Sequence, residues 1–173
     1  MYRKTIIHLL KHGVYLCLLL LFYVIQTNPY LFSFWGVKPL LVVPLAVVIA
    51  MQEGEFAGAW YGAAAGALCD LSMTKLFGLN AILLMLCCVA IGLAVIYLVQ
   101  FSPLNALLLT GAAMVVKDLF NYYFYYAMWG YEQVYMIFIG NMLPELVFTL
   151  AAEVLIYWLL TRIKAKFDSR LGE

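Results

Sequence analysis

Residues 58–72 read GAWYGAAAGALCDLS, with a glycine at every fourth position: Gly58, Gly62 and Gly66. The same spacing then reaches Asp70. A stripe of small residues is typical of helices in lipid, which pack by letting their backbones approach closely. A charged carboxylate inside a bilayer costs at least about 3 kcal/mol, so Asp70 is expected to face protein. We expect Asp70 either to make a polar contact at the C-terminal end of its helix or to anchor, through a hydrogen bond or ion pair, a helix crossing within the chain or a partner.

The composition of the whole chain agrees with a membrane setting. Its 173 residues are 67% hydrophobic and 11% charged, whereas a soluble domain is about 45–50% apolar and about 25% charged. A soluble fold of this length has too little interior to cover so much apolar side chain, which argues against a water-soluble helical bundle. We therefore predict an all-α polytopic membrane protein, with residues 1–173 forming a single integral membrane domain.

Apolar runs predict six transmembrane helices in one compact bundle. They cover about residues 5–34, 39–51, 55–73, 78–100, 104–127 and 143–163. The second run contains Pro44 and is only about 20 Å long, shorter than the hydrocarbon core of about 30 Å. We expect this segment to be tilted, broken or covered by its neighbours. Five crossings with a re-entrant second segment are the alternative.

Basic residues at the two ends of the chain predict its orientation. Seven of the ten Lys and Arg residues lie there, namely Arg3, Lys4, Lys11, Arg162, Lys164, Lys166 and Arg170. Lys and Arg concentrate on the cytoplasmic side of membrane proteins. Both termini are therefore expected in the cytoplasm, which requires an even number of crossings.

A polar network is expected inside the membrane, built from Lys117, Asp118, Glu145 and Glu153. Lys117 and Asp118 are adjacent, so on a helix they are expected to point about 100° apart and to need different partners. Lys117 is at a depth from which it can reach Asp70 or Glu153. One cation then stands beside four acids. Three acids are left to be protonated, to lie at the interface, or to bind a cation from outside the chain.

The last segment carries a polar stripe on one helical face. Its members recur every four residues and are Asn141, Glu145, Thr149, Glu153 and Tyr157. A stripe of this kind on a membrane helix is expected to point into the bundle or at another protein.

No motif in the sequence indicates catalysis. There is no GxSxG, HExxH, Walker or dinucleotide-binding pattern. His8 and His12 are spaced i, i+4, yet no third metal ligand lies near them. We therefore expect no enzymatic activity, no cofactor, no metal and no nucleic-acid partner.

Residues 37–82 resemble the family of the rod shape-determining protein MreD. The matching features are a Lys-Pro pair at the start of the second segment, a glycine-rich third segment that closes on Leu-x-Asp, and a Ser and a Gly before the fourth; here they are Lys38, Pro39, Leu68, Asp70, Ser72 and Gly78. The size and the six-segment layout also agree. The chain departs from the family in having Leu40 in place of an acidic residue, SMTK at residues 72–75, and QFSP in place of a basic loop.

The resemblance implies a non-enzymatic scaffold subunit of the elongation machinery (elongasome) in the bacterial cell membrane, with a role in cell shape and peptidoglycan synthesis. It implies that the chain binds MreC, and through MreC the polymerase RodA, a class B transpeptidase and MreB filaments. The glycine stripe with Asp70 is then the candidate helix-packing and partner surface. The alternative is a substrate-binding S component of an energy-coupling-factor vitamin transporter, which would hold a small molecule. Such components also have six helices and glycine-rich, Asp-ended segments.

Overall fold

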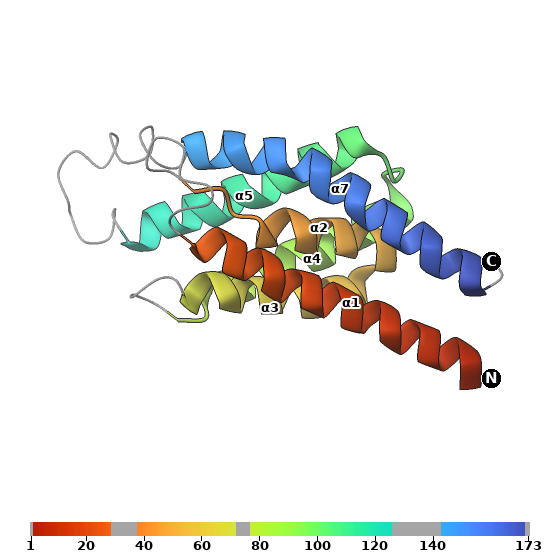
Figure 1. Ribbon diagram of the computed structural model, residues 1–173. Coiled ribbons are helices and arrows are strands. Elements are labelled where there is room, and N and C mark those ends of the chain that lie inside the picture. The colour runs from red at the N-terminus through yellow and green to blue at the C-terminus, as the bar shows by residue number, and fades with distance from the viewer. Residues whose placement is uncertain (1, 29–37, 72–76, 126–142, 172–173) are drawn as a thin grey trace.

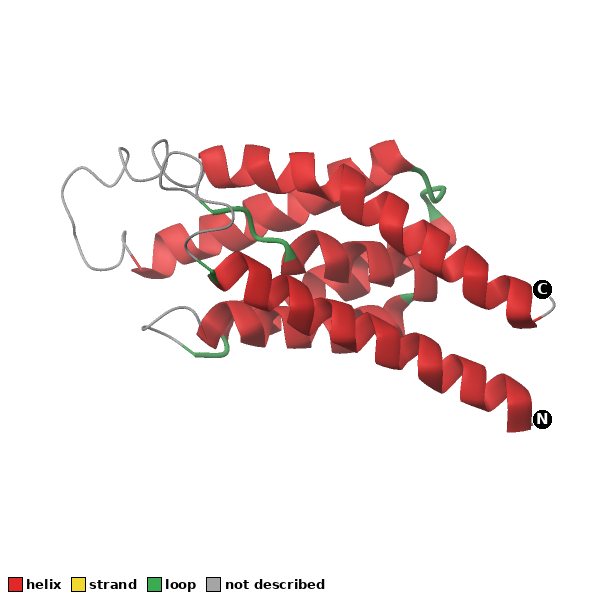
Figure 2. Ribbon diagram, viewed as in Figure 1, coloured by secondary structure: helices red, strands yellow, loops and turns green. Residues whose placement is uncertain are grey.

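The computed structural model describes residues 2–28, 38–71, 77–125 and 143–171, whose regular structure is entirely helical (Figures 1 and 2). The helices are α1 (Tyr2–Thr27), α2 (Val42–Glu53), α3 (Glu55–Leu71), α4 (Leu79–Tyr97), α5 (Pro103–Tyr125) and α7 (Leu143–Leu171). The two termini lie at the same end of the bundle (Figure 1). Below, this is called the terminal end, and the other the loop end.

Each apolar run of the sequence corresponds to one described helix. The predicted stretches at 29–34, 72–73 and 126–127 lie outside the described residues. α7 continues past residue 163 to Leu171, further than predicted. Its last turns are held by contacts: Lys164 Nζ donates to the Gln52 carbonyl oxygen at 2.9 Å, and Asp168 lies 3.8 Å from Lys11 Nζ.

Four of the described helices are long and apolar enough to cross a membrane: Ile6–Thr27, Leu79–Tyr97, Pro103–Phe124 and Leu143–Ser169. Their outward faces carry large apolar side chains, such as Leu9 and Leu155, each 73% exposed. Contiguous apolar surface of this kind is stable against lipid and not against water. The predicted class of a helical, multi-pass membrane protein is confirmed.

α2 occupies the centre of the bundle. It has 12 residues, and all ten from Val42 to Met51 are buried. It contacts each of the other five described helices. A helix that is apolar on every side has no polar face to turn to solvent, so it is stable only when surrounded. Of the three expectations for this short segment, coverage by its neighbours is confirmed.

The glycine stripe on α3 packs against α4. A Cβ atom added at Gly58 would lie 2.9 Å from the Cys88 carbonyl oxygen, and one at Gly62 would lie 2.6 Å from the Leu84 carbonyl oxygen. At Gly66 it would overlap the backbone of α4. The two backbones therefore touch along the whole stripe, and α3 and α4 form the most extensive helix pair of the bundle.

The surface is thus occupied by a helix of the same chain. Gly92 on α4 completes it from the other side, because a Cβ there would lie 2.7 Å from Glu55 Cα. Of the two possibilities that the sequence left open, an internal crossing is the one present. A partner that docks on this protein must meet a different face.

We expect Gly62→Ala to destabilise the protein by about 1–3 kcal/mol, because the new methyl group would press on α4 backbone that cannot rotate away. Thermal unfolding of the purified protein in detergent measures this change.

Gly13→Ala is the matched control, since nothing lies within 4 Å of the added Cβ on that exposed helix. It should leave stability equal or raise it by up to about 1 kcal/mol through helix propensity. Equal unfolding temperatures for Gly62→Ala and the wild type would contradict the close contact.

Candidate functional site: a buried polar layer

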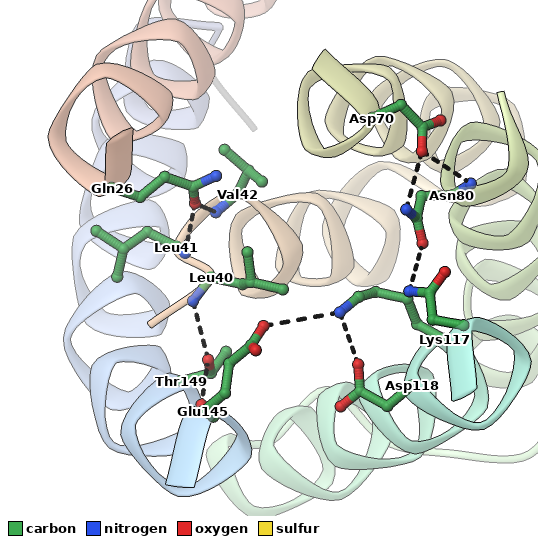
Figure 3. A network of polar contacts seen from close by, with 11 residues as sticks. Gln26, Leu40, Leu41, Val42, Asp70, Asn80, Lys117, Asp118, Glu145 and Thr149 are labelled. Carbon is green, nitrogen blue, oxygen red and sulfur yellow. Dashed lines mark hydrogen bonds and ion pairs between the residues drawn. The ribbon is translucent and has the colours of Figure 1, made fainter. Parts of the chain in front are cut away.

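Polar side chains from five helices form one layer toward the loop end of the bundle (Figure 3). We call this set the polar layer: Gln26, Asp70, Asn80, Lys117, Asp118, Asn121, Glu145 and Thr149. All are buried except Glu145, which is partly buried. Polar groups in such a position are stable only when they bind one another, so their contacts decide what the layer can do.

Asp70 caps the start of α4 from the end of α3. Its carboxylate accepts backbone N–H groups from Gly78 at 2.9 Å, Asn80 at 3.3 Å and Ala81 at 3.1 Å. The residue at the N-cap position is Gly78, which has no side chain to serve this purpose. An acceptor with negative charge at a helix N-terminus also interacts favourably with the helix dipole. Asp70 therefore fixes the α3–α4 hairpin without needing a cation.

A chain of amides extends this contact to α5. Asn80 Nδ2 donates to Asp70 Oδ1 at 2.8 Å, and Asn121 Nδ2 donates to Asn80 Oδ1 at 2.9 Å. Because Asp70 accepts only, every donor in the chain points from α5 toward α3. Asn121 Oδ1 is left without a partner among the described residues.

Lys117 lies one turn before Asn121 and carries the positive charge of the layer. Its Nζ atom is 2.7 Å from Asp118 Oδ1 and 3.7 Å from Glu145 Oε1. Lys117 is 2% exposed, so the two carboxylates replace its water shell. The pair with Glu145 joins α5 to α7.

Two expectations about these charges are wrong. Lys117 and Asp118 were expected to face apart, but the long lysine side chain bends back to the next residue. Lys117 also pairs with Glu145, and with neither Asp70 nor Glu153, the two acids that it was expected to be able to reach. Two of the four acids share the lysine, so two acids, not three, lack a cation among the described residues.

Side chains of α1 and α7 complete the layer by capping α2. Gln26 Oε1 accepts the N–H groups of Leu41 at 2.9 Å and Val42 at 3.3 Å. Thr149 Oγ1 accepts the N–H group of Leu40 at 3.0 Å and donates to the Glu145 carbonyl oxygen at 2.6 Å. The Leu-Leu-Val-Val sequence at the start of α2 offers no capping side chain of its own, so the cap comes from other helices.

Glu153 lies deeper in the bundle, on the same stripe of α7 as Glu145 and Thr149. Its Oε1 atom accepts the Thr110 hydroxyl at 2.6 Å, which links α7 to α5. Glu153 is 1% exposed, and its Oε2 atom has no partner among the described residues. The stripe thus faces the interior at Thr149 and Glu153, while Asn141 lies outside the described residues.

A second group of charges closes the terminal end. Lys11 is buried and lies 2.5 Å from Glu53 Oε1. The Tyr15 hydroxyl donates to Glu53 Oε1 at 3.4 Å and to Gln52 Oε1 at 3.3 Å. Together with the α7 contacts of Lys164 and Asp168, this group ties α1, α2 and α7 together.

The remaining predicted site residues fall at separate places. Lys38 is exposed and Pro39 is buried, just before α2. Gly78 has φ +102°, a left-handed conformation that glycine adopts without strain. Ser72 lies outside the described residues. In the part of the chain that the structure describes, no group of three or more His, Cys, Asp or Glu residues could hold a metal ion.

Several contributors were missed by reasoning from sequence: Gln26, Asn80, Asn121 and Thr110. Each is a polar residue within a predicted apolar run. A single polar residue in such a run indicates a buried hydrogen bond, so these residues could have been identified. Uncharged amides and hydroxyls give a weaker signal than acids do, because they cost less free energy to bury.

Asp70→Ala should destabilise the protein strongly, because each buried donor left without an acceptor costs about 1–3 kcal/mol. Asp70→Asn keeps one acceptor oxygen and should lie between Asp70→Ala and the wild type. Unfolding temperatures in detergent rank the three proteins. If Asp70→Ala unfolds at the same temperature as the wild type, the cap does not stabilise the α3–α4 hairpin.

Lys117→Met is expected to cost about 3–5 kcal/mol, because it leaves two acids buried without a cation. Adding Asp118→Asn and Glu145→Gln to that variant removes the unpaired charge and should restore most of the stability. Denaturant unfolding of the single and triple variants measures the difference. A triple variant no more stable than Lys117→Met would refute the charge pairing.

Comparison with known proteins places the chain in a family. No curated protein and no solved structure matched it. The family model described as rod shape-determining protein MreD matches residues 7–165, which include every described residue of the polar layer. The chain therefore belongs to the family of the rod shape-determining protein MreD.

Proposed function

We propose that the chain is a non-enzymatic scaffold subunit of the bacterial cell-wall elongation machinery. The observation that carries the proposal is the family match over residues 7–165, which gives the chain a role in rod shape determination. The proposal adds the assembly: the chain binds an MreC-like membrane protein, and through it RodA, a class B transpeptidase and MreB.

The way in which the buried polar groups are used supports a structural role. Asp70 binds backbone N–H groups, Asp118 and Glu145 share Lys117, and Glu153 binds a threonine hydroxyl. A catalytic site needs a reactive group that a substrate can reach. These acids are instead enclosed and engaged in joining helices, as expected of groups that hold one membrane domain together.

The arrangement of the ends supports six crossings with both termini in the cytoplasm of a bacterial cell. The two termini lie at one end of the bundle (Figure 1). α7 brings Arg162, Lys164 and Lys166 to that end, and α1 brings Lys11. Basic residues are retained on the cytoplasmic side, so this end is the cytoplasmic one in the proposal.

Depletion of the protein from a rod-shaped bacterium that encodes it is expected to give round cells. Re-expression of the wild type or of Gly13→Ala should restore rods, because that substitution touches nothing in the bundle. Gly62→Leu should fail, because the side chain would separate α3 from α4. Depleted cells that stay rod-shaped would contradict the proposal.

Affinity purification of the tagged wild-type protein from native membranes tests the partner. The expected result is co-purification of a single-span protein with an extracytoplasmic coiled coil. A tightly bound small molecule in place of such a protein would support the transporter alternative and count against the scaffold.

A further inference from the structure

An apolar groove opens on the lipid-facing surface between α1 and α7. Its volume is about 390 Å³. α1 contributes Phe22 and Ile25, the segment before α2 contributes Pro39, and α7 contributes Ala151, Ala152 and Leu155. The groove exists because two consecutive alanines on α7 leave space between larger side chains.

Lys38 is the sequence neighbour of one residue that lines this groove. It directly precedes Pro39, which lines the groove, and its side chain is exposed. Among the described residues no acidic side chain forms an ion pair with it, since the ion pairs there involve Lys11 and Lys117. The groove thus has an exposed cation one residue from its lining, and that cation forms no ion pair with an acid of the described residues.

The volume of the groove favours a small occupant over a helix. A helix with its side chains is about 10–12 Å across, so a single turn of it takes up more volume than the groove offers. A volume of about 390 Å³ instead falls within the usual range of about 300–1,000 Å³ for sites that enclose a small molecule. A flexible hydrocarbon chain fits such an apolar channel.

We propose that the groove binds an acyl chain of an anionic phospholipid, whose phosphate group lies against the ammonium group of Lys38. The groove supplies the contact for the chain, and Lys38 selects for negative charge in the headgroup. Each residue of the Lys-Pro pair then has a role: the proline lines the groove, and the lysine binds the headgroup. This site goes beyond the proposed scaffold function and does not depend on it.

Photolabelling tests the proposal with the full-length protein in nanodiscs. Phosphatidylglycerol or phosphatidylcholine carries a diazirine on one acyl chain, and mass spectrometry locates the adducts. We expect phosphatidylglycerol to label α7 residues 148–159 about fivefold more than phosphatidylcholine does, the preference that one lysine near a phosphate provides. Lys38→Gln should abolish the preference, and Ala151→Leu should reduce labelling by both lipids.

The chain offers matched controls for both variants. Lys166→Gln removes an exposed lysine from the terminal end of α7, and Ala112→Leu enlarges an exposed alanine on α5. Both should leave the labelling unchanged, and all four variants should unfold at the wild-type temperature because each changes an exposed side chain. Equal labelling by the two lipids in the wild type, or a preference that survives Lys38→Gln, would overturn the proposal. Cross-linking of Ala151→Cys to another protein in native membranes, with no lipid adduct, would assign the groove to a partner helix instead.

Discussion

Inside a bilayer no water is available to the free N–H groups at the start of a helix, so the protein must supply acceptors itself. Here the acceptors come from other helices. Asp70 on α3 serves α4, while Gln26 on α1 and Thr149 on α7 serve the start of α2. Each cap is therefore also a tertiary contact. The same bonds that complete secondary structure fix which helices are neighbours, and this explains why the polar groups gather in one layer.

The two ends of the bundle are closed by different chemistry. The loop end is held together by neutral amides, by backbone groups, and by one lysine that pairs with two acids. At the terminal end, Lys11 and Glu53 form a close ion pair with Asp168 nearby. Between the two ends, the described helices are held by apolar packing, which consists of the buried helix α2 and the glycine contact between α3 and α4. Glu153 is the charged residue in this middle region. The polar contacts of the described helices thus act as clamps at both ends of an apolar body.

Much of the fold was predictable because its signals are local. Apolar runs located the six helices, and the spacing of Gly58, Gly62 and Gly66 indicated a close crossing. The helix on the other side of that crossing was not predictable, since small residues indicate a close contact without indicating which helix makes it. The pairing of Lys117 failed for a related reason: helical angles describe where side chains leave the backbone, whereas a lysine has four carbons with which to turn. The sequence predicts a polar contact or an anchoring bond for Asp70, but the bond of its carboxylate to backbone groups across a loop has no sequence signature.

The position of α2 has a consequence for how the protein is made. This helix has only 12 residues, and the N–H group of Leu40, just before it, is bound by Thr149, 109 residues later in the chain. When α2 has been synthesised, α5 and α7 have not yet been made, so α2 cannot yet be buried against them. The bundle is therefore assembled around its centre only after synthesis is nearly complete, and a prematurely terminated chain would leave that centre uncovered.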